Sequence, residues 1–402
     1  MRILILSTDY ERFIRAEYAA HPGMETAPYS SQYRFRNESL FGTADFYSSN
    51  LRQIGHDAEE IYVNNRWLQY AWAREHGMDI DAPAPPSVTP DETAPQVRRA
   101  SPLVDAAKSV LRPLARKVGV AGMPRWEASI LRRQIEVLRP DIILNQSVDY
   151  VGSEFLKKFR KPGRLIIGQI ASPLPQSENY SAYDFMISSL PNFVTKFRAQ
   201  KVPAALNRLA FETSLLEKLS PAPARDIPLS FVGSLSPDHA KRIEWLEYMA
   251  THTPVKVWGT GIERLARSSP LWNCYQGEAW GRGMYDVLRR SHVTLNLHID
   301  LAENMANNMR LFEATGMATA LLTDQKENLS DLFIPGEHLL AYRSPEDCAN
   351  QALTLLSDKE RAAAIGLAGQ RHVLAHHSYL LRVKEIMDLV DLWRTSGPRA
   401  FL

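Results

Sequence analysis

The sequence NNMRLFEATGMATALLTD, residues 307–324, decides the fold of this chain. Its first part has the apolar spacing of an amphipathic helix that ends at Gly316, and its second part is typical of a short buried strand. Arg310 and Glu313 are three residues apart and share one helical face. Backbone N–H groups and a guanidinium bind phosphate oxygens, and a carboxylate accepts hydrogen bonds from ribose hydroxyls. The stretch therefore predicts a site for a nucleoside diphosphate.

A strand–helix alternation extends from this stretch through the carboxyl-terminal half. Strands that are joined by helices are expected to pair in parallel. The expected strands of this half are residues 229–234, 255–259, 293–298, 318–323 and 338–342. The expected helices are residues 237–251, one from about residue 283, the helix of the opening stretch, and three at the carboxyl terminus.

The amino-terminal half repeats the alternation less regularly. Its expected strands are residues 2–7, 58–63, 141–145, 164–169 and 183–188. After the first strand we expect an irregular segment, then a helix over residues 38–54. A second helix is expected over residues 124–138, where Pro124 suits the first turn. The two halves together predict two successive doubly wound α/β domains.

Two segments break this rhythm. Residues 212–228 carry three prolines among small residues, so we place the domain boundary there. Residues from about 80 to 122 combine a Pro-, Ala- and Ser-rich stretch with a basic segment. That composition predicts a flexible or helical excursion from the first domain.

The overall composition is that of a soluble globular enzyme of two or three domains. The 402 residues are 45% hydrophobic and 23% charged. A net charge of +2 gives no reason to expect nucleic acid as a partner. Basic residues cluster at 108–117 and 132–139. They predict a solvated face or, alternatively, a peripheral contact with a membrane surface or a polyanionic acceptor.

The compartment and metal content follow from a few residue types. Cys274 and Cys348 are too few for a disulfide framework, which favours a reduced, cytoplasmic location. The apolar run at residues 3–6 is too short for a signal peptide, and no later run could span a bilayer. The histidines at 372–377 lack a further ligand in a metal motif, so no metal site is predicted.

Five motifs in order narrow the interpretation. They are FVGS at 231–234, VWG at 257–259, NMRLFEA at 308–314, LLTD at 321–324 and the segment 369–379. With them the carboxyl-terminal half resembles the nucleotide-sugar domain of GT-B glycosyltransferases. More narrowly, it resembles the bacterial group related to the CgeB-like spore-maturation glycosyltransferases. The amino-terminal half is similar only in outline, as expected for a domain that receives a variable acceptor.

The resemblance implies a GT-B fold, with two facing Rossmann-like domains and an interdomain cleft. Residues 1–212 would bind the acceptor, residues 228–380 the nucleotide sugar, and a final helix at 381–402 would cross back to the first domain. It also implies sugar transfer without an obligatory metal or cofactor, the nucleoside-diphosphate sugar being a substrate. Retaining relatives often carry two glutamates separated by seven residues. Glu313 matches the second but Met305 stands at the first, which leaves the stereochemistry open.

Candidate donor ligands surround the opening stretch. Gly233, Ser234 and Arg310 are the main candidates for stabilising the leaving phosphate, since a glycine turn at a strand end permits close backbone approach. The alternatives are an ordinary tight turn and a surface salt bridge. The remaining donor candidates are Arg242 and His298 for phosphate, Asn308 for phosphate or helix capping, Glu313 for ribose, and Trp258, Gly259, Tyr275 and Gln276 for the base or for plain packing.

A general base is sought in the amino-terminal half. Asp45 stands close to the start of its expected helix and is the first candidate, with stabilisation of the first helical turn as the alternative. Asp9 follows the first strand directly, and His21 precedes a Pro-Gly turn and would line the acceptor site instead.

The sequence thus predicts a cytoplasmic glycosyltransferase. It would move a sugar from a UDP- or GDP-linked donor to a hydroxyl of a glycan, lipid-linked or protein acceptor. Two alternatives are a sugar-nucleotide epimerase on the same scaffold and a non-catalytic glycan- or nucleotide-binding assembly protein.

Overall fold

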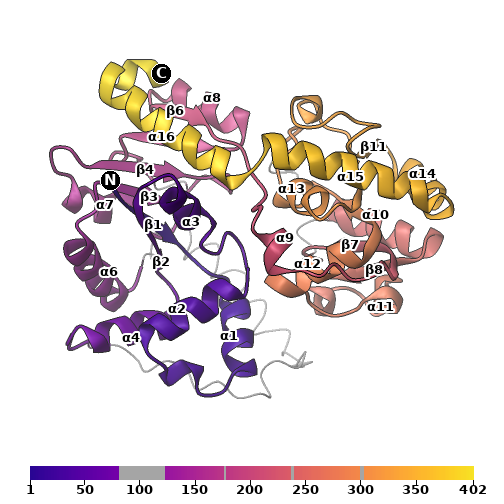
Figure 1. The fold of residues 1–402 in the computed structure, drawn as a ribbon, viewed down its shortest axis with the longest axis horizontal. Helices are drawn as coiled ribbons and strands as arrows, with labels where there is room; N and C mark the ends of the chain where they lie inside the picture. The colour runs from indigo at the N-terminus through magenta and orange to yellow at the C-terminus, as the bar shows by residue number, and fades with distance from the viewer. Residues whose placement is uncertain (81–122, 176–177, 237–239, 299–302) are drawn as a thin grey trace. The chain divides into compact units, whose positions relative to one another are not determined.

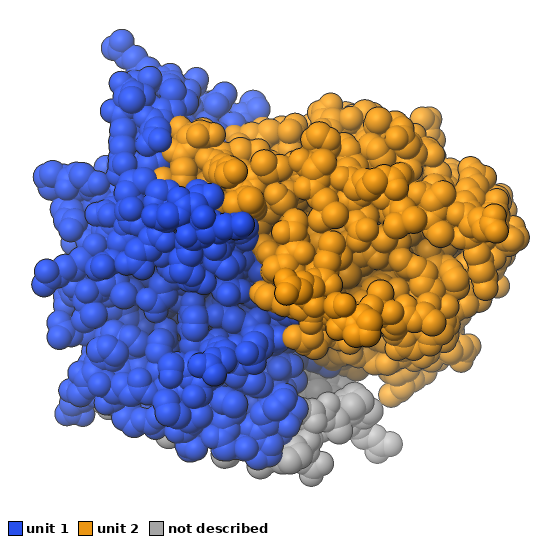
Figure 2. Space-filling view, in the orientation of Figure 1, with its two compact units in different colours: residues 1–188, 192–205, 390–402 blue, residues 189–191, 206–389 orange. Residues whose placement is uncertain are grey.

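The computed structural model describes residues 1–80, 123–175, 178–236, 240–298 and 303–402. It divides into two compact units (Figures 1 and 2). Unit 1 comprises residues 1–188, 192–205 and 390–402, and unit 2 comprises residues 189–191 and 206–389. The predicted excursion lies, from residue 81 onward, outside the described residues.

Unit 1 is built on a parallel six-stranded sheet. In spatial order its strands are β2 (Asp57–Tyr62), β1 (Arg2–Ser7), β3 (Ile142–Asn145), β4 (Leu165–Gln169), β5 (Phe185–Ser188) and β6 (Ala204–Leu206). The sheet grows in one direction from β1 to β2 and in the other from β3 onward. The ends of β1 and β3 therefore form a point where the strand order reverses.

One helix prediction in unit 1 is wrong. Of the helix expected over residues 38–54, only residues 46–53 (α3) form a continuous helix, and they follow a turn in which Leu40, Gly42 and Ala44 have positive φ. Another helix, α2, precedes that turn and ends at Glu38, in the segment expected to be irregular. The sequence concealed α2 because that helix buries polar side chains in place of an apolar stripe. The helices of unit 1 are α1 (Glu11–Ala20), α2 (Tyr29–Glu38), α3 (Phe46–Gln53), α4 (Arg66–Glu75), α6 (Arg125–Leu138), α7 (Ser153–Leu156) and α8 (Pro191–Ala199).

Unit 2 is built on a parallel five-stranded sheet. In spatial order its strands are β11 (Leu340–Tyr342), β10 (Ala320–Asp324), β9 (Ser291–Asn296), β7 (Ile227–Val232) and β8 (Val255–Trp258). Here the order reverses between β7 and β9, and the two parallel sheets with flanking helices confirm the predicted α/β class. Each predicted strand of both halves is present, displaced by no more than a couple of residues.

The helices of unit 2 follow the predicted alternation. They are α9 (Leu215–Lys218), α10 (Ala240–His252), α11 (Leu271–Cys274), α12 (Gly281–Arg290), α13 (Met309–Gly316), α14 (Pro345–Ser357), α15 (Lys359–His376) and α16 (Tyr379–Ser396). The helix of the opening stretch, α13, ends at Gly316 as predicted. Helix α16, drawn in yellow in Figure 1, begins in unit 2 and ends in unit 1.

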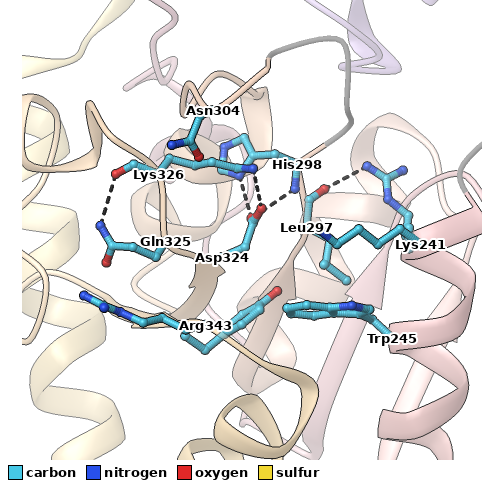
Figure 3. Close-up of a pocket in the computed structure, with 11 residues that line it drawn as sticks. Lys241, Trp245, Leu297, His298, Asn304, Asp324, Gln325, Lys326 and Arg343 are labelled. Carbon is cyan, nitrogen blue, oxygen red and sulfur yellow. Dashed lines mark hydrogen bonds and ion pairs between the residues drawn. The ribbon is translucent and has the colours of Figure 1, made fainter.

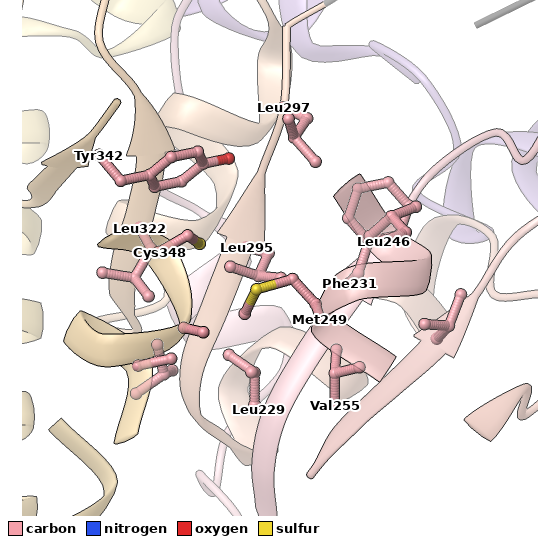
Figure 4. Packing of buried hydrophobic residues seen from close by; sticks show 14 of the residues in the cluster. Leu229, Phe231, Leu246, Met249, Val255, Leu295, Leu297, Leu322, Tyr342 and Cys348 are labelled. Atoms are coloured by element: carbon pink, nitrogen blue, oxygen red, sulfur yellow. The ribbon is translucent and has the colours of Figure 1, made fainter. Parts of the chain in front are cut away.

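The hydrophobic core of unit 2 supports the carboxyl ends of its strands (Figure 4). Leu246 and Met249 of α10 pack with Phe231 and Leu295 of the sheet, and all four side chains are nearly inaccessible to water. Burying such side chains stabilises the fold by about 1.5–3 kcal/mol each. Tyr342 belongs to the same cluster and stands at the end of β11, so the core reaches the edge where the strands end.

A close backbone contact holds α15 to the turn before β10. A Cβ atom at Gly366 would lie 2.2 Å from the Ala318 carbonyl oxygen, so only glycine permits this approach. Gly283, in α12, is exposed, and a Cβ atom there would meet nothing within 4 Å.

We predict opposite effects of alanine at these two helical glycines. Gly366→Ala is expected to destabilise unit 2 by about 1–3 kcal/mol, the usual effect of overpacking. Gly283→Ala is expected to stabilise it by up to about 1 kcal/mol, because alanine has the higher helix propensity. Urea and thermal unfolding of both variants measure this. Equal effects of the two substitutions would contradict the packing described for α15.

Candidate functional site

The reversal point of unit 2 holds the amino terminus of α13. The Asn308 side chain caps this helix by accepting a hydrogen bond from the Leu311 amide at 3.2 Å. Its Nδ2 donates to Oδ1 of Asn296, the last residue of β9, at 2.6 Å. The positive end of the helix dipole is thereby tied to the carboxyl end of the sheet, where open α/β sheets bind ligands. This arrangement suits an anion.

Arg242 supplies a cation at the same point. It stands in the first turn of α10 and donates to the carbonyl of Leu297, after β9, at 2.8 Å. A longer contact of 3.4 Å reaches the carbonyl of Ser234, after β7. The guanidinium therefore lies between the ends of the two strands where the order reverses, next to the Gly233–Ser234 turn.

Arg310 and Glu313 share a face of α13, as predicted, but they bind each other. Their side chains are 2.8 Å apart and only 15% and 8% exposed. Arg310 also donates to the Val232 carbonyl at 3.3 Å, and the Tyr285 hydroxyl donates to Glu313. Burial raises the pKa of Glu313, and Arg310 opposes that rise. The predicted contacts of this pair with phosphate and ribose stay predictions.

Gly233 and Gly259 bring the ends of β7 and β8 together. A Cβ atom at Gly259, which has φ of +158°, would lie 1.7 Å from the Gly233 carbonyl oxygen. The Gly233 amide donates to the Trp258 carbonyl at 3.0 Å. Close packing is thus sufficient reason for both glycines, against backbone at Gly259 and against the Phe231 ring at Gly233. Their predicted contact with a donor stays a prediction.

The candidate base ligands gather at the end of β8. The Tyr275 hydroxyl donates to the Gly259 carbonyl at 2.8 Å, which fixes this loop. The backbone amide of Gln276 donates to the Val257 carbonyl at 2.8 Å, while the Gln276 side chain is exposed. Trp258 is half-buried. The structure therefore brings these residues together beside β7, and recognition of a base by them stays a prediction.

A polar pocket of about 240 Å³ extends along the same edge of the sheet, from β9 to β11 (Figure 3). Most of its residues were not predicted as ligands, although nearly all directly follow a predicted strand or begin α10. That position, at the carboxyl ends of parallel strands, is the signal that could have identified them. Its lining residues are Lys241, Arg242, Trp245, Leu297, His298, Asn304, Asp324, Gln325, Lys326, Tyr342 and Arg343.

His298 and Asp324 form a buried pair in this pocket (Figure 3). His298 Nδ1 lies 2.6 Å from Asp324 Oδ1, and Lys326 Nζ lies 3.1 Å from Asp324 Oδ2. Burial alone would raise the pKa of Asp324, but the hydrogen bonds and charge of His298, with Lys326, lower it to about 2. His298 Nε2 is buried and has no hydrogen-bond partner among the described residues. His298, predicted as a phosphate ligand, therefore retains a polar atom for one.

The three candidate bases of unit 1 have different partners and different exposure to water. Asp9 is fully buried, and Nε of Arg36 donates to both of its carboxylate oxygens at 2.9 Å, which disfavours proton abstraction. Asp45 directly precedes α3, half-buried, with Arg52 3.9 Å away. His21 is exposed at the end of α1, with Nδ1 2.9 Å from the Glu17 carbonyl. Their catalytic roles stay predictions. Of the two candidate carboxylates, Asp45 is the more accessible.

The carboxyl-terminal histidines have structural partners. Nε2 of His372 and Nε2 of His377 lie 2.7 and 3.0 Å from the Leu332 carbonyl oxygen. Burial, with the charge of Arg382, lowers the pKa of His377 to about 3. Among the described residues no three potential metal ligands come together. In the same part of the chain, no helix has the length and apolar character needed to cross a membrane.

Comparisons with known proteins agree with this geometry. A family model described as glycosyl transferase-like matches residues 241–388, which include α10, α13 and most of the pocket. No match to the sequence is found among curated proteins.

Solved structures resemble the whole chain. Sucrose-phosphate synthase from Thermosynechococcus elongatus is 13% identical, with a TM-score of 0.55 over 98% of this chain and 100% of that one. Anabaena Alr3699/HepE in complex with UDP-glucose is 11% identical, with a TM-score of 0.54 over 97% and 99%. AviGT4, a glycosyltransferase involved in avilamycin A biosynthesis, is 10% identical, with a TM-score of 0.53 over 98% and 97%. The solved structures confirm the predicted GT-B fold, and the family model supports the predicted glycosyltransferase class.

The buried pair on α13 generates a prediction about stability. Arg310→Met is expected to destabilise unit 2 by about 3–5 kcal/mol, because it leaves Glu313 buried without its partner. Adding Glu313→Gln to that variant is expected to recover much of the loss. Urea unfolding of the two single variants and the double variant measures the coupling. Strictly additive losses would show that the two side chains do not depend on each other.

Proposed function

We propose that this protein transfers a sugar from a nucleoside-diphosphate donor to a hydroxyl of a glycan, lipid-linked or protein acceptor. The observation that carries the proposal is the reversal point of unit 2. There the capped amino terminus of α13 and the Arg242 guanidinium meet at the carboxyl edge of the sheet. Arg242 and α13 both lie within the segment that matches the glycosyl transferase-like model.

The donor would bind with its diphosphate at this point. Helix amide groups and a guanidinium are strong ligands for phosphate oxygens. The glycines at 233 and 259 let the ends of β7 and β8 approach each other closely, and Tyr275 and Gln276 stand beside them for the base. A UDP-linked donor is favoured over a GDP-linked one, since a structure similar to this chain is described as a complex with UDP-glucose.

The chemistry follows from where charge develops. As the bond between the sugar and the diphosphate breaks, negative charge grows on the leaving phosphate. The α13 dipole and Arg242 would stabilise that charge, so the residues present supply what a metal ion supplies elsewhere. If the reaction inverts the anomeric centre, a base must accept the acceptor's proton, and Asp45 is our candidate.

Finer assignments belong to the same proposal. We place the protein near the bacterial CgeB-like group, in the cytoplasm, with a peripheral membrane contact if the acceptor is lipid-linked. An epimerase would consume the donor without an acceptor, and a binding protein would release no nucleoside diphosphate. Release of UDP that depends on an added acceptor separates the transferase from both.

Binding of UDP tests the site itself. We expect Arg242→Gln to weaken UDP binding about 10-fold or more, because a charge-assisted hydrogen bond to phosphate is lost. Isothermal titration calorimetry on the full chain measures the affinity, and thermal unfolding without ligand checks the fold.

Lys359→Gln is the matched control for that variant. It removes the same charge from the same unit, at the exposed start of α15. The charge of Lys359 contributes to lowering the pKa of His292, which lies near the amino end of β9. Lys359 therefore stands near the amino ends of the strands, away from the carboxyl ends that carry the site. If UDP bound both variants and the unaltered protein equally, Arg242 would not be part of the donor site.

A further inference from the structure

The pocket beyond the reversal point is strongly basic. Four cationic side chains line it, from Lys241, Arg242, Lys326 and Arg343, and Asp324 supplies the one carboxylate among its described lining residues (Figure 3). Arg242 lies between the ends of β7 and β9, where the diphosphate is placed above. The other three exceed what that diphosphate requires.

Two of these three cations follow strands at the same edge of the sheet, away from the base site, while Lys241 stands in α10. Lys326 follows β10 and Arg343 follows β11, whereas the candidate base ligands follow β8 on the other side of β7. Neighbouring strands are about 4.8 Å apart, so β11 lies about 10 Å from β9. A diphosphate at the reversal point with its base toward β8 would therefore direct its sugar into this pocket.

These cations can accept a ligand. Lys326 shares Asp324 with His298, so this carboxylate serves two partners. The Arg343 guanidinium makes no hydrogen bond or ion pair with any described residue, while its backbone amide donates to Asp347 at 3.0 Å. Charge-assisted hydrogen bonds from Lys and Arg to a carboxylate are among the strongest that proteins form.

The rest of the lining suits a sugar ring. Trp245 is half-buried and presents an aromatic surface, with its ring 5.6 Å from that of Tyr342 (Figure 3). The Tyr342 hydroxyl donates to the Asn296 carbonyl, which fixes the base of the pocket. Asn304 and Gln325 add amide groups that can bind hydroxyls. An aromatic surface, amides and the cations of Lys326 and Arg343 together match a sugar that carries an acidic group.

We propose that the donor sugar is a hexuronic acid, whose carboxylate is bound by Lys326 and Arg343. This inference rests on the proposed function, since it assumes that a nucleoside diphosphate occupies the reversal point. It narrows the donor from nucleotide sugars in general to those with a negatively charged sugar.

Six probes in two series test the proposal by calorimetry on the full chain. The uridine series is UDP, UDP-glucose and UDP-glucuronic acid, and the guanosine series is GDP, GDP-mannose and GDP-mannuronic acid. We expect the uronic acid donor to bind about 10-fold or more tightly than its neutral counterpart. The Lys326→Gln/Arg343→Gln double variant is expected to abolish that difference while leaving the affinity for the nucleoside diphosphate unchanged. Lys359→Gln is expected to retain the difference.

The outcomes separate the two proposals. Equal affinity for neutral and acidic donors, with the nucleoside diphosphate bound, would overturn the uronic acid assignment and leave the transferase site standing. Loss of nucleoside diphosphate binding in the double variant would also overturn it, because the pocket would then hold the diphosphate. Failure of the unaltered protein to bind either nucleoside diphosphate would overturn the proposed function as well. Should the double variant not fold, Arg343→Gln alone serves, because it breaks no ion pair between described residues.

Discussion

The hydrogen bond between Asn308 and Asn296 is the contact on which the site in unit 2 depends. It ties the amino terminus of α13 to the last residue of β9, while the same Asn308 side chain caps the helix. Without it, no side chain of the helix cap would hold the amino terminus of α13 against the end of β9. With it, their partial charges converge where the strand order reverses, and Arg242 adds a full charge at that position.

The same edge of the sheet combines rigidity with an uneven distribution of charge. Next to β8, glycine contacts and the Tyr275 hydroxyl hold the loops that carry the candidate base ligands. Next to β10 and β11, cations surround the Asp324 carboxylate, whose pKa of about 2 keeps it ionised and bound to His298. A ligand with a planar nucleobase at one end and negative charge in its middle and at its other end complements this arrangement.

Sequence periodicity predicted the sheets well because buried parallel strands are short apolar runs. It failed at residues 29–54, where left-handed turn residues separate α2 from α3 and where α2 buries polar groups that carry no apolar pattern. The site was predicted in part. Spacing placed Arg310 and Glu313 on one face, but could not show that they would bind each other. Lys326 and Arg343 belong to no motif, and only the order of strands in space brings them to one pocket.

A crystal structure of the full chain with UDP tests the central claim most directly. The claim predicts the diphosphate at the carboxyl ends of β7 and β9, within hydrogen-bonding distance of Arg242 and of the first amides of α13. A diphosphate bound to unit 1, or at any part of unit 2 distant from α13, would contradict it.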